Sequence, residues 1–441
     1  MLESAFWLLY LATPVIMVFL LKLAGEQVNR ISLINIVVLS IYTFSIIGTM
    51  PLFYHWNEYQ ADIGVVDQTL IFEILLYSSV NLIFLLVGVI FFRAFFRLRP
   101  KRSYPVIKQL GKKQLMGLFA VLFLSVAITF FYISQLDSVA LFVALSSGIK
   151  EAAVSRSLMG NDFSGKYHWY RLFMNDASQF IVFILFANYL VNNSKRGLIY
   201  FSSAFLFSTF TAIMSTEKGP LVWLLIGLHL VYFLVKRNGV IPIASALKFS
   251  VILVGALILM YIFFMGSSDI SSAFFSIFSR TFTGQIAPAY FYLEYFPALQ
   301  NYLWGSTFPN PGGLLPFSPY RYTVEIMNWV FPNLATTGVV GSMPTVFWGE
   351  SYVNFGPLGI PIIAFFVGIM LTVISWAIGM LKWSAVRIGL VVWAIIHYKD
   401  LYATGFSDFF VDTVFVVIFL IAFLINSLGS NDKLRREIVY R

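Results

Sequence analysis

The stretch TLIFEILLYSSVNLIFLLVGVIFF, residues 69–92, holds one charged side chain, Glu73, in 24 positions. A bilayer core about 30 Å thick is crossed by roughly 20 predominantly apolar residues of helix, so this stretch is long enough to span a membrane. The segment that follows, 93–113, is rich in Arg and Lys and contains no acid. An apolar helix followed by a basic loop predicts a membrane-spanning helix that ends on the cytoplasmic side.

Comparable apolar runs recur along the 441 residues, of which 59% are hydrophobic and 11% charged. We therefore expect an all-α, polytopic transmembrane helix bundle of about eleven spans, a single membrane domain over 1–441. The first run has no basic residue before it and is interpreted as a helix and not as a cleaved signal peptide. The runs cover 5–24, 32–52, 69–92, 115–136, 175–192, 198–215, 219–235, 246–266, 355–380, 384–398 and 408–428.

The basic side chains of the short loops set the orientation of the chain. When the spans are counted outward from 93–113, the other basic loop residues fall on the same side. This agreement predicts a periplasmic N-terminus and a cytoplasmic C-terminus, and it explains the net charge of +9 without a nucleic-acid partner. The residues concerned are Lys22, Arg30, Lys195, Arg196, Lys236, Arg237, Lys382, Arg387, Lys433, Arg435 and Arg436.

Two long loops face the other side of the membrane in this topology. One is 137–174, and the larger is 267–354, which is rich in Pro, Gly and aromatic residues. Loops of such length without secondary structure are uncommon in compact domains and are usually functional. We expect them to be periplasmic and to contain short helices that lie at the membrane interface.

The motifs of soluble enzymes are missing from the sequence, which has no P-loop, no HExxH and no GxSxG elbow. The chain has no Cys, and its four His are far apart in sequence, so we expect neither a metal nor a cofactor. Glu73 and Asp176 lie near the ends of spans. This scarcity of ionisable groups at mid-depth argues against an ion-coupled carrier.

Several basic residues on the predicted outer side break the positive-inside trend. They either bind a phosphate or diphosphate near the headgroup level, or they snorkel to water in the ordinary way. Lys218 is the strongest candidate for anion binding among them, because it precedes Gly219-Pro220 at the expected start of a helix, where anions are favoured. A salt-bridged hairpin is the alternative for this turn. The set comprises Arg156, Lys166, Arg171, Lys218, Arg280 and Arg321.

Glu350 stands at the predicted outer end of a late span, after Trp348-Gly349. A carboxylate there can act as general base toward a sugar hydroxyl, and the rings of Trp348, Tyr352 and Phe355 can stack on sugar faces. The alternative is that Glu350 only stabilises the first turn of its helix.

The chain resembles the Wzy-type polymerases of O-antigen and oligosaccharide repeat units in the bacterial inner membrane. The resemblance rests on loose motifs together with the overall plan of many helices and long outer loops. The motifs are Ser215-Thr216-Glu217-Lys218-Gly219-Pro220, Phe278-Ser279-Arg280-Thr281, Ala289-Tyr290-Phe291-Tyr292, Phe296-Pro297, Trp304-Gly305-Ser306-Thr307-Phe308-Pro309-Asn310-Pro311, Gly349-Glu350-Ser351-Tyr352 and Asn354-Phe355-Gly356.

This resemblance implies a metal-independent glycosyltransferase. It would transfer a growing glycan from undecaprenyl diphosphate to a new lipid-linked repeat unit on the periplasmic face, with a chain-length regulator as a candidate partner. The resemblance makes Arg280 and Lys218 the first candidates for diphosphate binding, with Arg156 and Arg321 next. Glu350 becomes the candidate base or orienting acid, and Trp348, Tyr352, Asn354 and His168 become candidates for sugar binding.

Two other functions remain open at this stage. A flippase for lipid-linked oligosaccharide would need charged residues inside the bundle. An O-antigen ligase shares the architecture that the resemblance implies, but the catalytic His of ligases has no matching motif around His168 or His397.

Overall fold

The computed structural model describes residues 1–98, 107–160, 163, 166–265, 274–275, 277–310, 313, 316–335 and 341–429. Within these residues every regular element is a helix and there is no β-strand, and two isolated bridges, Arg30 with Val240 and Lys108 with Ser384, join loops. The expected all-α class is confirmed. The tail with Lys433, Arg435 and Arg436 lies outside the described residues.

Eight helical segments among the described residues are long and apolar enough to cross a membrane. This number supports a membrane protein, but the expected count of eleven spans is not confirmed. Of the other three runs, α20 (Ala385–Tyr398) has 14 residues and is shorter than a typical span of about 20. Helix α11 (Lys195–Ile213) carries many Ser and Thr side chains, and α13 (Ile243–Met265) is apolar over Ile243–Leu259. The eight are Leu2–Leu23, Leu33–Phe53, Gln68–Phe95, Lys112–Ile133, Tyr167–Asn192, Gly219–Lys236, Trp348–Met380 and Ser407–Leu428.

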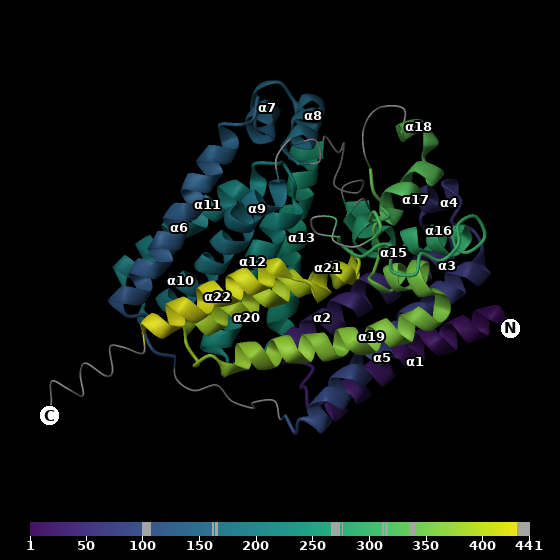
Figure 1. Ribbon diagram of the computed structural model, residues 1–441, viewed down its shortest axis with the longest axis horizontal. Coiled ribbons are helices and arrows are strands. Elements are labelled where there is room, and N and C mark those ends of the chain that lie inside the picture. The colour runs from purple at the N-terminus through teal and green to yellow at the C-terminus, as the bar shows by residue number, and fades with distance from the viewer. Residues whose placement is uncertain are drawn as a thin grey trace.

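The longest helices, α5 (Gln68–Phe95) and α19 (Trp348–Met380), pack along each other (Figure 1). Their backbones touch at two glycines. A Cβ on Gly88 would collide with the carbonyl oxygen of Phe365, and a Cβ on Gly368 would collide with that of Leu85. Small residues allow helices to approach this closely. Close packing matters in membranes, because an apolar side chain gains little from contact with another helix in place of lipid.

A second group of helices packs around α10 (Ser178–Asn192), most of whose side chains are buried. Helices α11, α12 (Gly219–Lys236) and α20 all contact α10, and α6 (Lys112–Ile133) and α22 (Thr413–Leu428) contact each other (Figure 1). Helix α1 (Leu2–Leu23) packs on α5 in the first group, where the hydroxyls of Thr13 and Ser79 are 2.9 Å apart.

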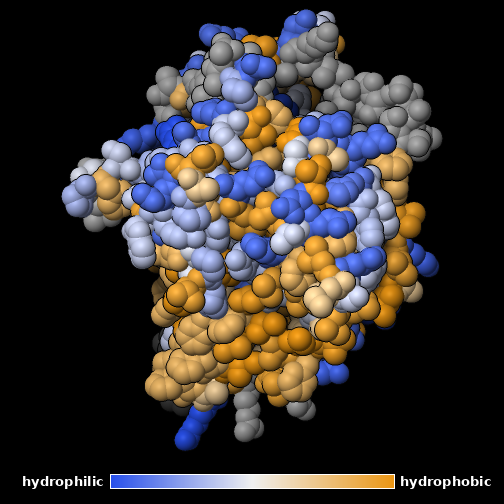
Figure 2. Space-filling model, turned by 90° about the vertical axis from the view of Figure 1, so that its right-hand side faces the viewer, coloured by the Kyte–Doolittle hydropathy of each residue, from blue (hydrophilic) through white to orange (hydrophobic). Residues whose placement is uncertain are grey.

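The two long loops contain the short helices that the sequence predicted. Figure 1 places α7, α8 and α18 at one end of the molecule, and Figure 2 shows hydrophilic side chains gathered at that end above a hydrophobic surface. Their placement at a membrane interface stays a prediction. The remaining elements are α2 (Leu33–Ile41), η1 (Tyr42–Ile46), α3 (Thr49–Phe53), α4 (Glu58–Asp62), α7 (Ala140–Ser146), α8 (Ile149–Met159), α9 (Tyr167–Arg171), η2 (Leu172–Ala177), η3 (Ser279–Thr283), α15 (Gly284–Ile286), α16 (Pro288–Tyr295), α17 (Tyr322–Val330), α18 (Pro332–Ala335), η5 (Lys399–Tyr402) and α21 (Ser407–Phe410).

Replacing Gly368 by Ala should destabilise the protein by about 1–3 kcal/mol, because the added methyl forces α19 away from the Leu85 carbonyl. The measurement is denaturant unfolding of the full-length protein in detergent. Gly255→Ala is the control, since a Cβ there meets nothing within 4 Å. It should leave stability unchanged or raise it by up to about 1 kcal/mol through helix propensity. Equal effects of the two changes would contradict the close contact.

Candidate functional site

Glu350 lies in the first turn of α19 and is 2% exposed. Its Oε1 accepts a hydrogen bond from the Thr307 hydroxyl at 2.6 Å, and its Oε2 accepts one from the Ser407 N–H at 3.0 Å. Two segments far from α19 in sequence are therefore joined by one carboxylate. The Gly405 backbone lies so close to this carboxylate that a Cβ there would collide with it.

The segment 303–307 is held against α19 because that helix is interrupted. Gly356 adopts φ +66°, and Pro357 has no N–H, so the carbonyls of Val353 and Asn354 are free to accept bonds from outside the helix. The Leu303 N–H donates to Val353 O at 2.9 Å, and the Trp304 N–H donates to Asn354 O at 3.0 Å.

The Asn354 side chain completes this connection. Its Oδ1 accepts from the Gly305 N–H at 2.8 Å, while its Nδ2 donates to the Thr307 hydroxyl and to the Glu350 carbonyl, both at 2.8 Å. The amide is fully buried. In this structure Asn354 therefore positions the 303–307 segment, and its amide is not exposed to a sugar.

The sugar-stacking role expected for Trp348 and Tyr352 does not fit this structure. Trp348 is 0% exposed, and its indole Nε1 donates to Ser78 Oγ of α5 at 3.0 Å. Tyr352 is buried, and its hydroxyl donates to Phe296 O at 2.9 Å. Both rings face the helix packing because α5 and α16 cover the first turns of α19. The ring of Phe355 remains partly exposed.

Three of the four residues predicted to bind diphosphate come together. Lys218 is the N-cap residue of α12, Arg156 lies in α8, and Arg280 lies in η3. Burial lowers the pKa of Lys218 to about 8, with further lowering by the nearby positive charges of Arg280 and Arg156. Like charges act in this way only when they are close, so these residues form a basic cluster, defined here as Lys218, Arg280 and Arg156.

Two further candidates lie on other helices and are exposed. Arg321 is the N-cap residue of α17. His168 is exposed in α9, with its ring against that of Trp169. Their roles in binding diphosphate and sugar stay predictions.

A chain of hydrogen bonds connects the basic cluster to the region of Glu350. The Gln285 side chain donates to Arg280 O at 3.2 Å, and the Thr345 hydroxyl donates to Gln285 O at 3.0 Å. Thr345 lies five residues before Glu350 in sequence. Burial, and then the charge of Glu350, raises the pKa of Tyr322. The Tyr322 side chain therefore lies near Glu350.

Sequence reasoning missed a group of ionisable residues inside the bundle. His397 Nε2 lies 2.8 Å from Asp412 Oδ2, and the Tyr398 hydroxyl donates to the same oxygen at 2.7 Å. Trp393 Nε1 donates to Asp176 Oδ1 at 3.3 Å. The run His397-Tyr398-Lys399-Asp400 at the end of α20 is a signal that could have found this group.

Lys399 lies beside that group and is 2% exposed. Its ammonium pairs with Asp400 and lies 3.9 Å from the centroid of the Trp223 ring. Within the described residues, no group of three or more His, Asp or Glu side chains is placed to hold a metal ion. The site is thus built from cations, hydroxyls and carboxylates.

No protein-family model, no curated protein and no solved structure matches this chain. Function is therefore argued from the chemistry of the residues themselves. That chemistry has two parts, which are a basic cluster at the polar end and a buried carboxylate that fixes the segments around it.

Thr307→Val should destabilise the protein by about 1–3 kcal/mol, because it removes a hydroxyl that donates to Glu350 and accepts from Asn354. The measurement is denaturant unfolding of the full-length protein. Thr323→Val in the neighbouring α17 is the control, with an expected change of about 0.5 kcal/mol or less. A Thr307 variant as stable as the Thr323 variant would show that the Glu350 contact is dispensable.

Arg280→Gln should raise the pKa of Lys218 above about 8, because removal of a nearby positive charge favours the ammonium form. The pKa can be read from the pH dependence of Lys218 modification by an amine reagent, followed by peptide mass spectrometry. Arg321→Gln is the matched control and should leave that pH dependence unchanged. An unaltered profile in the Arg280 variant would mean that the two cations are not neighbours.

Proposed function

We propose that this chain is a membrane-embedded glycosyltransferase that joins repeat units of a surface polysaccharide carried on undecaprenyl diphosphate. The observation that carries the proposal is the proximity of Arg280 and Arg156 to Lys218, with Arg156 on α8, a helix at the end of the molecule where hydrophilic side chains gather (Figure 1 and Figure 2). A diphosphate on a lipid presents its negative charge at this level, beside the membrane surface. Arg recognises it with a planar fork and Lys as a point charge.

The chemistry needs charge stabilisation and positioning more than a strong catalytic group. The bond between the anomeric carbon of the growing glycan and its diphosphate breaks. The hydroxyl oxygen at the non-reducing end of the next unit bonds to that carbon, and the hydroxyl proton ends on the departing diphosphate. The basic cluster stabilises the negative charge that develops on this leaving group, without requiring a metal.

Glu350 fits the role of orienting acid better than that of base. Both of its oxygens are occupied by Thr307 and Ser407, and the side chain is buried. It therefore fixes the loop segments that flank the acceptor. Phe355, Arg321 and His168 are placed on or near the exposed surface, where they can contact the glycan.

The proposal includes a topology. The chain lies in the bacterial inner membrane, with the N-terminus and loops 137–174 and 267–354 in the periplasm and the C-terminus in the cytoplasm. Eleven spans result if α11, α13 and α20 also cross. A chain-length regulator is a further proposed partner at the periplasmic face.

A second candidate is a flippase for lipid-linked oligosaccharide. The buried group of Asp176, His397 and Asp412 favours it, because ionisable residues inside a bundle often mark a transport pathway. A third possibility, an O-antigen ligase, uses the same donor. The three functions leave different glycans behind when the protein is lost.

Deletion of the gene should abolish long polysaccharide and leave single repeat units attached to their final acceptor. This result, read from the size ladder of the surface glycan, follows if the protein joins units. Lipid-linked single units retained on the cytoplasmic side would instead indicate the flippase. Long polymer that stays on its lipid carrier would indicate the ligase.

Complementation with Arg280→Gln or Lys218→Gln should not restore long polysaccharide, because each change removes a charge from the basic cluster. Lys382→Gln removes an equal charge from an exposed residue between α19 and α20 and is the matched control. Protein levels in the membrane fraction show whether each variant inserts. Full-length ladders from an inserted Arg280 variant would refute the role of the cluster.

A further inference from the structure

A cavity of about 310 Å³ lies at the other end of α19 from Glu350. Ligand pockets begin at about this size. The cavity is bordered by the connection from α1 to α2, the end of α5, the last turns of α19 and the start of α20. Glu350 and Thr372 are 22 residues apart on α19, about 33 Å at the rise of a helix, so the cavity is separate from the candidate site.

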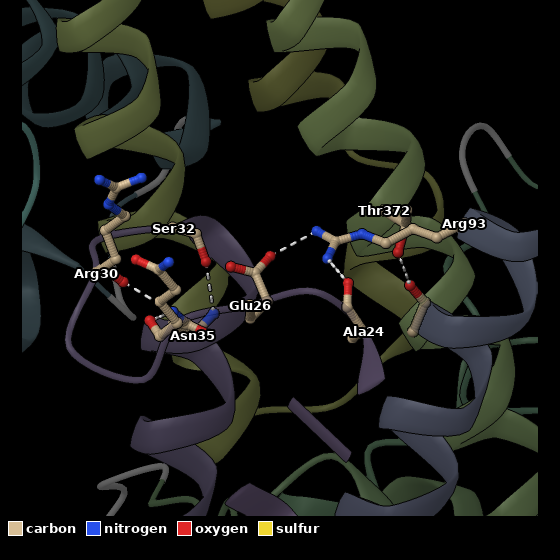
Figure 3. A network of polar contacts seen from close by, with 9 residues as sticks. Ala24, Glu26, Arg30, Ser32, Asn35, Arg93 and Thr372 are labelled. Carbon is tan, nitrogen blue, oxygen red and sulfur yellow. Dashed lines mark hydrogen bonds and ion pairs between the residues drawn. The ribbon is translucent and has the colours of Figure 1, made fainter. Parts of the chain in front are cut away.

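The lining of the cavity is positively charged. Among the described residues that line the cavity, Arg30, Arg93 and Arg387 stand against one acid, Glu26, so their net charge is +2. Figure 3 shows the Glu26 carboxylate between Ser32 and the Arg93 guanidinium. The distance from Arg93 Nη2 to Glu26 Oε1 is 2.5 Å, and Arg93 Nη1 donates to Ala24 O at 2.6 Å. Arg93 is thus largely occupied by its acid and by the end of α1.

Arg387 is held in a defined orientation beside this ion pair. Its Nη1 donates to Leu381 O at 2.9 Å, and its guanidinium carbon lies 5.2 Å from the centroid of the Trp383 ring. The side chain is half-buried. A guanidinium fixed by a carbonyl and an aromatic ring loses little entropy when it binds an anion.

The lipid-facing edge of the cavity is apolar and aromatic. Trp376 and Met380, which border it, are 49% and 61% exposed. Trp is enriched where a membrane protein meets the headgroup level. A ligand with one anionic end and one apolar end therefore matches both parts of this surface.

We propose that this cavity binds a phosphate group, with Arg30 and Arg387 as its recognition residues. The phosphate belongs either to the headgroup of an anionic phospholipid or to a soluble phosphate compound. The Arg fork matches phosphate oxygens, and basic pockets between membrane helices are suited to anionic headgroups. The Arg93–Glu26 pair holds the ends of α1 and α5 around the bound group.

The test uses full-length protein purified in an uncharged detergent and stripped of lipid. Phosphatidylglycerol, a diacylglycerol with the same chains and inorganic phosphate are added separately, and the thermal unfolding midpoint is followed. Phosphatidylglycerol should raise the midpoint, because it binds the folded state, and diacylglycerol should not. Competition by inorganic phosphate would identify a soluble compound as the ligand, and its failure to compete would identify the lipid.

The double variant Arg30→Gln with Arg387→Gln should weaken phosphatidylglycerol binding about tenfold or more, as expected for lost charge-assisted hydrogen bonds. Lys382→Gln is the control, since this residue is exposed, does not line the cavity and carries the same charge. Equal weakening of binding in the control variant would overturn the proposal. So would the result that neither phosphatidylglycerol nor inorganic phosphate stabilises the unaltered protein.

A further variant covers the case in which the double variant does not fold. Ser375→Trp fills the cavity without changing any charge, because Ser375 is a half-buried lining residue. It should abolish the response to phosphatidylglycerol. A full response from this variant would place the bound lipid elsewhere and overturn the proposal.

Discussion

The backbone contact between α5 and α19 is the constraint on which the rest of the structure depends. Gly88 and Gly368 bring each helix against a carbonyl of the other, so sliding or rotation of α19 would create a collision. The bond from Trp348 to Ser78 fixes the same pair nearer the polar end. Helix α19 carries Glu350 at one end and borders the arginine-lined cavity at the other. The contact that fixes α19 against α5 therefore also fixes the positions of these two sites.

The break in α19 converts that rigid helix into a support for loops. A regular helix uses every carbonyl internally, and a loop then needs other partners for its N–H groups. Gly356 and Pro357 release the carbonyls of Val353 and Asn354, which take up the N–H groups of Leu303 and Trp304. The polar loop is thereby held by backbone bonds and by Glu350, in a region where water competes little for either.

The helical class and most of the spans could be predicted from the sequence, because long apolar runs such as 69–92 have one stable solution in lipid. The expected eleven spans are not confirmed, because eight segments among the described residues are long and apolar enough to cross, and hydropathy alone does not distinguish a short helix such as α20 from a span. The proximity of Arg156, Lys218 and Arg280 was anticipated only through the resemblance. The burial of Trp348 depends on its contact with Ser78 in a distant helix, which no local pattern encodes. The run His397-Tyr398-Lys399-Asp400 indicates a group of ionisable residues, but only the fold brings His397 to Asp412.

The basic cluster is the feature that most demands a functional explanation. Burial of Lys218, and then the nearby charges of Arg280 and Arg156, raise the energy of its charged form, which is why its pKa falls to about 8. A chain that needed these cations only as membrane anchors would keep them apart and in water, at no such cost. Perturbed lysines of this kind gather at functional sites, and an anion would offset the mutual repulsion of the three cations. The proposed lipid-linked diphosphate would supply that negative charge.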